Sequence, residues 1–177
     1  MTDDTRRLLK LINRAIDSLY ISLINNGAVE RLTKALESVG NGKTIDKNVT
    51  FARITKSMLS EINVIRELQG KTLLTKRNIT AFSGAINEHL GEHIKNYGSA
   101  RNVAQAAFDV LTSKDTLILP GNIEGKGTVL ANRNTNNRFI DSVALSNTES
   151  GKTSLKSISP RSNKQIKKLS TKKRELT

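Results

Sequence analysis

Two histidines and a glutamate in one short segment are the residues best suited to metal chemistry in this chain. His89, Glu92 and His93 fit the pattern H-x-x-E-H, in which two imidazoles on one helix face bind zinc while the carboxylate activates a water. A third protein ligand is needed, and Glu149 and Glu175 lie in polar segments that position a ligand poorly. We therefore expect both histidines on the solvated side of a helix, without a metal, and keep zinc hydrolysis as the last alternative.

The segment Gly151-Lys152-Thr153 has the ending of a phosphate-binding loop. Such a loop needs a glycine five positions before Gly151, where this chain has Ser146, and a long helix after it, where this chain has Pro160. A hydrolase triad is equally unsupported, because both histidines lie in one segment and no serine stands in a G-x-S-x-G turn. We expect a protein that is not an enzyme and that uses no cofactor or small-molecule substrate.

Positive charge is the strongest chemical signal, and it gathers in residues 151–177. These residues hold nine lysines and arginines and the single acid Glu175, so they supply +8 of the formal net charge of +13. Such cations neutralise phosphates without sequence preference, and no aromatic residue follows Phe139 to stack on bases. We expect polyanion binding, to DNA, RNA or an acidic protein face; the alternative is a solvated terminus that keeps the protein soluble. The predicted binding residues are Lys152, Lys156, Arg161, Lys164, Lys167, Lys168, Lys172, Lys173 and Arg174.

A second basic cluster, of Lys71, Lys76 and Arg77, begins a segment that we expect to be helical, 72–97. The positive end of a helix dipole would add to the charge of these three side chains. We therefore predict a secondary anion site there.

The absence of cysteine excludes disulfides and thiolate metal sites. The N-terminus is acidic, at Asp3 and Asp4, and lacks the basic region of a signal peptide. No apolar run approaches the roughly 18 residues that a spanning helix needs. We expect a protein without a signal peptide or a membrane span, located in the cytoplasm or within an assembled particle.

Apolar residues recur at spacings of three and four through the first 113 residues, which is typical of helices with one buried face. The pattern predicts helices over about 5–26, 29–40, 49–69, 72–97 and 99–111, of which the fourth contains Gly84 and Gly91 as points of close approach to a neighbour. About five amphipathic helices in this length predict a small helical bundle, residues 1–113.

The pattern changes after residue 113. Residues 114–150 are rich in glycine and asparagine, with short β-prone segments at 116–119, 128–131 and 139–145. From residue 146 onward, serine, threonine, asparagine and lysine predominate, a composition typical of disorder. The predicted fold class is therefore mainly α: a bundle followed by an extended, largely irregular C-terminal arm, 114–150, and a basic low-complexity tail, 151–177.

These features predict a non-enzymatic structural or assembly component, whose arm and tail become ordered on other protein subunits or on nucleic acid. By analogy with small helical subunits of multi-subunit shells, we expect a viral particle such as a phage assembly. The runner-up is a free nucleic-acid-binding accessory or regulatory protein that uses the tail electrostatically. A zinc hydrolase at His89, Glu92 and His93 is the third alternative.

Overall fold

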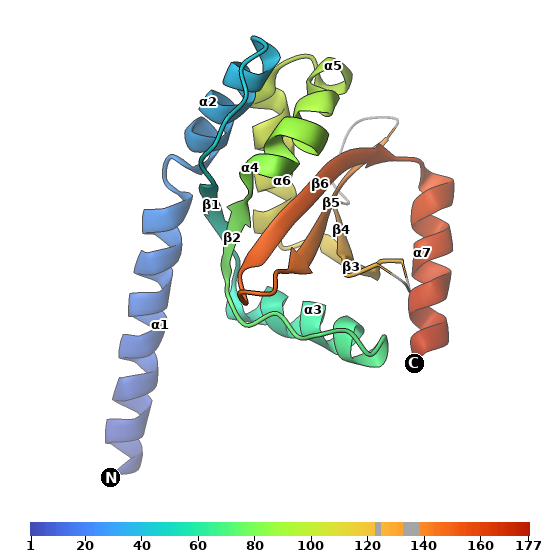
Figure 1. The fold of residues 1–177 in the computed structure, drawn as a ribbon. Helices are drawn as coiled ribbons and strands as arrows, with labels where there is room; N and C mark the ends of the chain where they lie inside the picture. The colour runs from blue at the N-terminus through green and yellow to red at the C-terminus, as the bar shows by residue number, and fades with distance from the viewer. Residues whose placement is uncertain (123–124, 133–138) are drawn as a thin grey trace.

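The computed structural model describes residues 1–122, 125–132 and 139–177. In these residues a six-stranded mixed sheet is combined with helices, and a long N-terminal helix, α1 (Asp3–Asn25), extends away from the body (Figure 1). The fold is therefore α/β.

The sheet has the strand order β1-β2-β6-β5-β4-β3. Pairing of β2 with β6 is parallel, with Ile79 opposite Thr153, and the other strand pairs are antiparallel. This parallel pair joins the early antiparallel pair of β1 and β2, which has a helix in its connection, to a late antiparallel meander, so one sheet combines both halves of the chain. The strands are β1 (Val49–Arg53), β2 (Asn78–Ala81), β3 (Thr116–Pro120), β4 (Thr128–Asn132), β5 (Ile140–Asn147) and β6 (Thr153–Arg161).

The predicted mainly α fold with a largely irregular arm is wrong, because residues 116–161 supply four strands of this sheet. The alternation of a half-buried strand is present in β5, where Val143 and Leu145 lie in the main core. On the other side of the same strand stand Ser142, Ala144 and Ser146. The serines Ser142 and Ser146 make the segment resemble a disordered one by composition, although the period is that of a strand.

Two of the predicted helices also contain strands. Residues 49–69 begin as β1, and α3 (Lys56–Leu68) starts only after Thr55, whose hydroxyl accepts a hydrogen bond from the Met58 amide at 3.1 Å. Residues 72–97 contain β2 and then four short helical turns. Spacings of three and four misled in both segments, because Phe51 and Ile79 lie in strands while Ile54 and Phe82, three residues further on, lie just beyond those strands. The turns are α4 (Ser83–Ala85), η1 (Ile86–Leu90), η2 (Gly91–His93) and α5 (Ile94–Tyr97).

The remaining predicted helices are confirmed as α1, α2 (Ala28–Gly40) and α6 (Ala100–Thr112). The Ser99 hydroxyl caps α6 by accepting from the Asn102 amide at 3.1 Å. The expected close approach is confirmed at Gly91, where a Cβ atom would lie 2.7 Å from Cγ1 of Val39 on α2, but Gly84 has no neighbour within 4 Å of that position.

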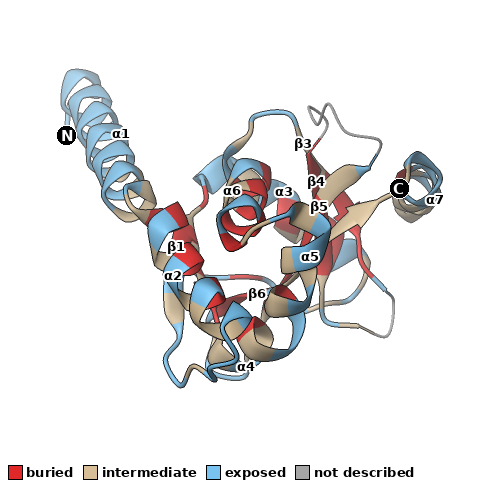
Figure 2. Cartoon of the chain, turned by 90° about the horizontal axis from the view of Figure 1, so that it is seen from above, coloured by how far each residue is buried: buried red, intermediate tan, exposed pale blue. Residues whose placement is uncertain are grey.

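Helices cover the two faces of the sheet in different ways. Alternate residues of β4 separate the two sides: Leu130 joins the main core with α3 and α6, whereas Val129 and Ala131 pack with Ile166 of α7 (Asn163–Leu176). We call the face on which α7 packs the outer face. Figure 2 shows buried residues concentrated between α6 and the strands, with α7 at the side near β3, β4 and β5.

Candidate nucleic-acid interface

A groove lies between α7 and the outer face of the sheet. One part, of about 810 Å³, is lined by α7 together with residues of β4 and β6. A second hollow, of about 340 Å³, continues over β5 and β6. The two share Gly121, Asn122, Val129 and Arg161, so they form one continuous surface, which we call the α7 groove.

Five cations from separate elements line the α7 groove. Lys126 precedes β4, Lys156 and Arg161 belong to β6, and Lys168 and Lys172 belong to α7. Among the described residues that line the groove, Glu175 is the only acid. This excess of positive charge along a concave surface raises the local concentration of anions.

A β-bulge places Lys156 at the surface. Leu155 pairs with Leu145 and Ser157 pairs with Ala144, so Lys156 is the extra residue between them on β6. Leu155 is buried, whereas Lys156 is exposed. Lys156 therefore has no paired residue on β5, and its exposed side chain lines the groove, where a ligand can contact it.

Arg161 stands at the end of β6 and is fixed by the strand beside it. Its Nε donates a hydrogen bond to Oγ of Ser142 at 2.9 Å. Partial burial lowers the pKa of the Arg161 guanidinium, yet arginine keeps its charge at physiological pH. The groove therefore has a fixed cation at its centre, where its two parts meet.

Helix α7 is positioned by a cap and by apolar contacts. The Ser162 hydroxyl accepts from the Gln165 amide at 3.2 Å, while the Gln165 side chain accepts from the Ser162 amide at 2.8 Å, which is a capping box. Ile166 is buried against Leu119, Val129 and Ala131. Residues that resemble a disordered tail by composition therefore form a docked helix with Lys168 and Lys172 turned toward the groove.

Lys71, in the loop after α3, and Lys172 of α7 hold the turn between β3 and β4 at the floor of the groove. Lys71 Nζ donates to the carbonyl oxygens of Asn122 and Gly127, each at 2.8 Å. Burial is the main reason that the pKa of Lys71 is lowered, and the charges of Arg66 and Lys172 lower it further. These three cations lie close together and make the field at this end of the groove positive.

The structure brings four of the nine predicted tail residues into the α7 groove: Lys156, Arg161, Lys168 and Lys172. The others do not line it, and Lys152 precedes β6 at the turn from β5. Lys164, Lys167 and Arg174 are exposed on α7, and Lys173 is half-buried. Sequence reasoning missed Lys126, because the glycines around it indicated only a flexible joint.

The predicted secondary anion site is divided among different partners. Lys71 binds the β3–β4 turn, and Arg77 is buried and donates to Asp17 of α1, with Nη2 and Oδ2 separated by 2.9 Å. Lys76 is exposed. These residues precede or enter β2 and do not begin a helix.

The histidine motif lies in two short helical turns, and the segment Gly151-Lys152-Thr153 lies at the turn between β5 and β6. His89 is exposed in the π-helical turn η1, and His93 ends the 3-10 turn η2 with its Nδ1 3.1 Å from Nδ2 of Asn96. The described part of the chain contains no group of three or more His, Asp or Glu residues able to hold a metal ion. Gly151 has a φ of 82° in the tight β5–β6 turn, where a hydroxyl of Thr148 accepts from the Lys152 amide.

Within the described ranges, no helix combines the length and the apolar character that crossing a membrane requires. Comparison with protein-family models, curated proteins and solved structures finds no match for this chain.

Proposed function

We propose that this protein is a non-enzymatic nucleic-acid-binding protein whose α7 groove follows a sugar–phosphate backbone. The observation that carries the proposal is the convergence of five cations, from the β3–β4 turn, β6 and α7, around one groove with a single described acid. Lysine and arginine neutralise phosphates and release counterions, which gives affinity without base recognition. The described lining includes no aromatic side chain, and this favours backbone contacts over base stacking.

The packing of α7 makes this surface a better ligand site than a flexible basic tail. Ile166 and the capping box hold the helix against the sheet, and Ser142 holds Arg161. Cations on docked elements lose less conformational entropy on binding than cations on a disordered chain. The groove therefore has its charges in place before the nucleic acid arrives.

A salt titration with a charge-removing variant tests the proposal. Lys126, Lys156 and Lys168 are exposed side chains of the groove, so Lys126→Gln, Lys156→Gln and Lys168→Gln together should leave the fold intact. Binding of labelled duplex DNA, single-stranded DNA and RNA is measured by fluorescence anisotropy across a salt series. For duplex DNA we expect the triple variant to lose at least about tenfold in affinity near 0.1 M salt and to reduce the slope of log K against log salt by roughly 2 to 3.

A matched variant separates the groove from total charge. Lys152→Gln, Lys164→Gln and Lys167→Gln together also remove three exposed cations, none of which lines the groove. We expect this control to bind nearly as tightly as the natural protein. Equal weakening by the two triple variants would assign binding to net charge alone, and absence of binding by the natural protein at low salt would refute the proposed function.

An assembly component remains the second candidate function, and the feature that favours it is the exposed apolar side of α1. A helix that presents leucines and isoleucines to solvent is typical of a subunit interface. Light scattering of the purified protein, alone and after pull-down of its partners, tests this candidate; a strict monomer without a stable protein partner contradicts it. The setting in a phage particle stays a prediction from analogy.

A further inference from the structure

Helix α1 presents a continuous apolar stripe that its own body does not cover. It has 23 residues, none of them buried, and is roughly 34 Å long. The stripe extends over its whole length, and Leu19 and Leu23 are 70% and 72% exposed although they lie nearest the body along the helix. The large apolar residues of the stripe are Leu8, Leu9, Ile12, Ile16, Leu19 and Leu23, whereas the exposed Leu11 lies among the basic residues outside it.

The side of α1 that touches the body is the opposite one. Only Asp17, Ile21, Ile24 and Asn25 of this helix are partly buried. Asp17 is paired with Arg77, and the Ile24 carbonyl accepts from Arg31. At about 100° per residue, Asp17, Ile21 and Ile24 share a side that faces away from the stripe. The body therefore contacts α1 on the side of Asp17, Ile21 and Ile24 and leaves the apolar stripe facing outward.

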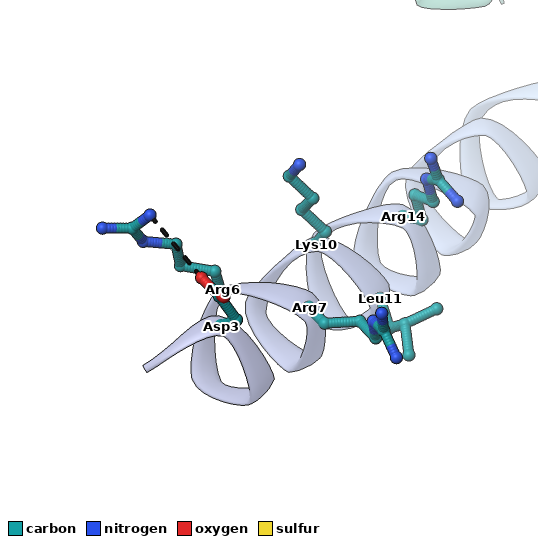
Figure 3. A pocket seen from close by; sticks show the side chains of 6 residues that line it. All are labelled: Asp3, Arg6, Arg7, Lys10, Leu11 and Arg14. Atoms are coloured by element: carbon teal, nitrogen blue, oxygen red, sulfur yellow. Dashed lines mark ion pairs between the residues drawn. The ribbon is translucent and has the colours of Figure 1, made fainter. Parts of the chain in front are cut away.

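The basic side chains of α1 lie outside the stripe. Arg6, Lys10 and Arg14 follow one side of the first turns, Arg7 stands beside Leu11, and Arg6 forms an ion pair with Asp3 (Figure 3). The apolar positions of the stripe repeat every seven residues, at Leu9, Ile16 and Leu23 and again at Ile12 and Leu19. A seven-residue repeat with charges on the outer side is the pattern of a helix that pairs with another helix.

We infer that α1 pairs with α1 of a second copy of this chain, in antiparallel orientation. The stripe is nearly symmetric about Arg14, because reversal places Leu9 opposite Leu19 and Ile12 opposite Ile16. A self-complementary surface of this kind is what a two-fold contact requires. The inference concerns the stripe alone and does not depend on the α7 groove.

Charge decides the orientation. A parallel pair would bring the basic residues of both copies together at one end of the dimer, where only Asp3 and Asp4 of each copy balance them. These basic residues are Arg6, Arg7, Lys10 and Arg14. An antiparallel pair separates these groups to opposite ends and sets the two helix dipoles head to tail. It also leaves room for both bodies, since each is attached at residues 17–25 on the side away from the partner helix.

The area of the stripe sets the strength of the pair. A strip about 34 Å long and about 10 Å wide covers roughly 340 Å² per copy, less than half of the about 800 Å² per partner of a standard stable interface. The six aliphatic side chains of the stripe in each copy supply the attraction, and the association cost offsets much of it. The dimer should therefore be reversible, with a dissociation constant in the micromolar range.

Sedimentation of the full chain, from roughly 1 to 300 µM, brackets such a dissociation constant. We expect the natural protein to pass from monomer to dimer over this range. Leu19→Glu places a charge in the stripe and should weaken the dimer at least about tenfold, whereas Ser18→Glu adds the same charge at an exposed position away from the stripe and should behave as the natural protein. A strict monomer at the highest concentration, or equal effects of the two variants, would overturn the inference.

Orientation is tested by crosslinking, because the chain has no cysteine of its own. A mixture of Leu9→Cys and Leu19→Cys proteins, treated with a short bis-maleimide, should give a crosslinked heterodimer. Leu9→Cys alone should not crosslink, since antiparallel pairing separates the two copies of this residue by about 15 Å along the helix. Crosslinking of Leu9→Cys alone would show a parallel pair instead.

Binding to vesicles of phosphatidylserine by a monomeric protein would assign the stripe to a membrane surface and overturn the pairing.

The groove provides a separate readout, because Leu19→Glu should leave the salt dependence of nucleic-acid binding unchanged if both proposals hold. If Leu19→Glu abolishes the dimer but the natural protein binds no nucleic acid, the proposed function of the α7 groove is refuted and the pairing of α1 stands. If the natural protein binds nucleic acid but stays strictly monomeric, the pairing of α1 is refuted and the function of the groove stands.

Discussion

The two terminal helices place their apolar residues in opposite environments. α1 has seven large exposed aliphatic residues and no buried one, whereas α7 has few apolar residues, of which Ile166 is buried and Leu169 packs beside it. The difference lies in what each helix meets. Leu119, Val129 and Ala131 on the outer face of the sheet leave an apolar patch that α7 covers, while the body meets α1 with Arg53 and Arg77. Amphipathic strength alone thus does not predict where a helix docks.

The largest expected effect is at the anchor of α7. Ile166→Ala removes a buried side chain and leaves a cavity against Leu119 and Val129, so we expect a loss of about 2 to 4 kcal/mol in the free energy of unfolding. Urea denaturation followed by circular dichroism measures this loss, and hydrogen exchange shows whether residues 163–176 open first. The loss should be independent of pH, because no titrating group is removed; unchanged protection of α7 would contradict the described packing.

The anchor of α1 should respond to acid. The hydrogen bond from Arg77 is the largest cause that lowers the pKa of Asp17 below its usual 3.8. A lowered carboxyl pKa contributes stability that is present above pH 3.8 and is lost as the pH falls through the lower value in the folded protein. Asp17→Asn should therefore cost about 1 to 3 kcal/mol at neutral pH.

The comparison of Asp17→Asn with the natural protein is made by urea denaturation at several pH values. The two curves should converge in strong acid, where Asp17 is protonated in both the folded and the unfolded natural protein. Asp3→Asn provides the control, because the Asp3–Arg6 pair is exposed at 3.9 Å and exposed pairs contribute little. A cost of Asp17→Asn that stays constant down to strong acid would contradict the ionic attachment of α1.

The smallest effect should come from the stripe itself. Leu19→Ala deletes the same kind of side chain as Ile166→Ala, but from a position that is 70% exposed, so the stability of the monomer should change by no more than about 0.5 kcal/mol. Thermal or urea unfolding at low micromolar concentration measures it. A loss as large as that of Ile166→Ala would mean that the stripe is already covered by the body.

Capping residues and regular periods made part of the fold predictable. Ser99 and Gly27 mark real helix boundaries, and α1, α2 and α6 follow the expected spacing. The sheet was not predicted because its outer side contains small polar residues such as Ser142 and Ser146, and because Phe51 of β1 and Ile54 beyond it have a helical spacing. Strand pairing between distant segments, which a local pattern does not encode, decided these cases.

The candidate site was predictable in its chemistry and not in its shape. Charge density alone pointed to Lys156, Arg161, Lys168 and Lys172, which line the α7 groove. Which of the nine basic residues gather there depends on the bulge in β6 and on the side of α7 that Ile166 turns to the sheet. Lys126 joins them only through the pairing of β3 with β4, so its position follows from tertiary structure.

The parallel pairing of β2 with β6 has a consequence for synthesis and folding. Thr80 lies opposite Ser154, and β6 (Thr153–Arg161) is an inner strand between β2 and β5, so a nascent chain lacks the middle of its sheet until about residue 161 has been made. Closing such a long loop is entropically costly and slows folding. Until then β2, which is paired with β1 on one side, has an unpaired edge on the other, and this edge exposes the incomplete chain to chaperones and to aggregation.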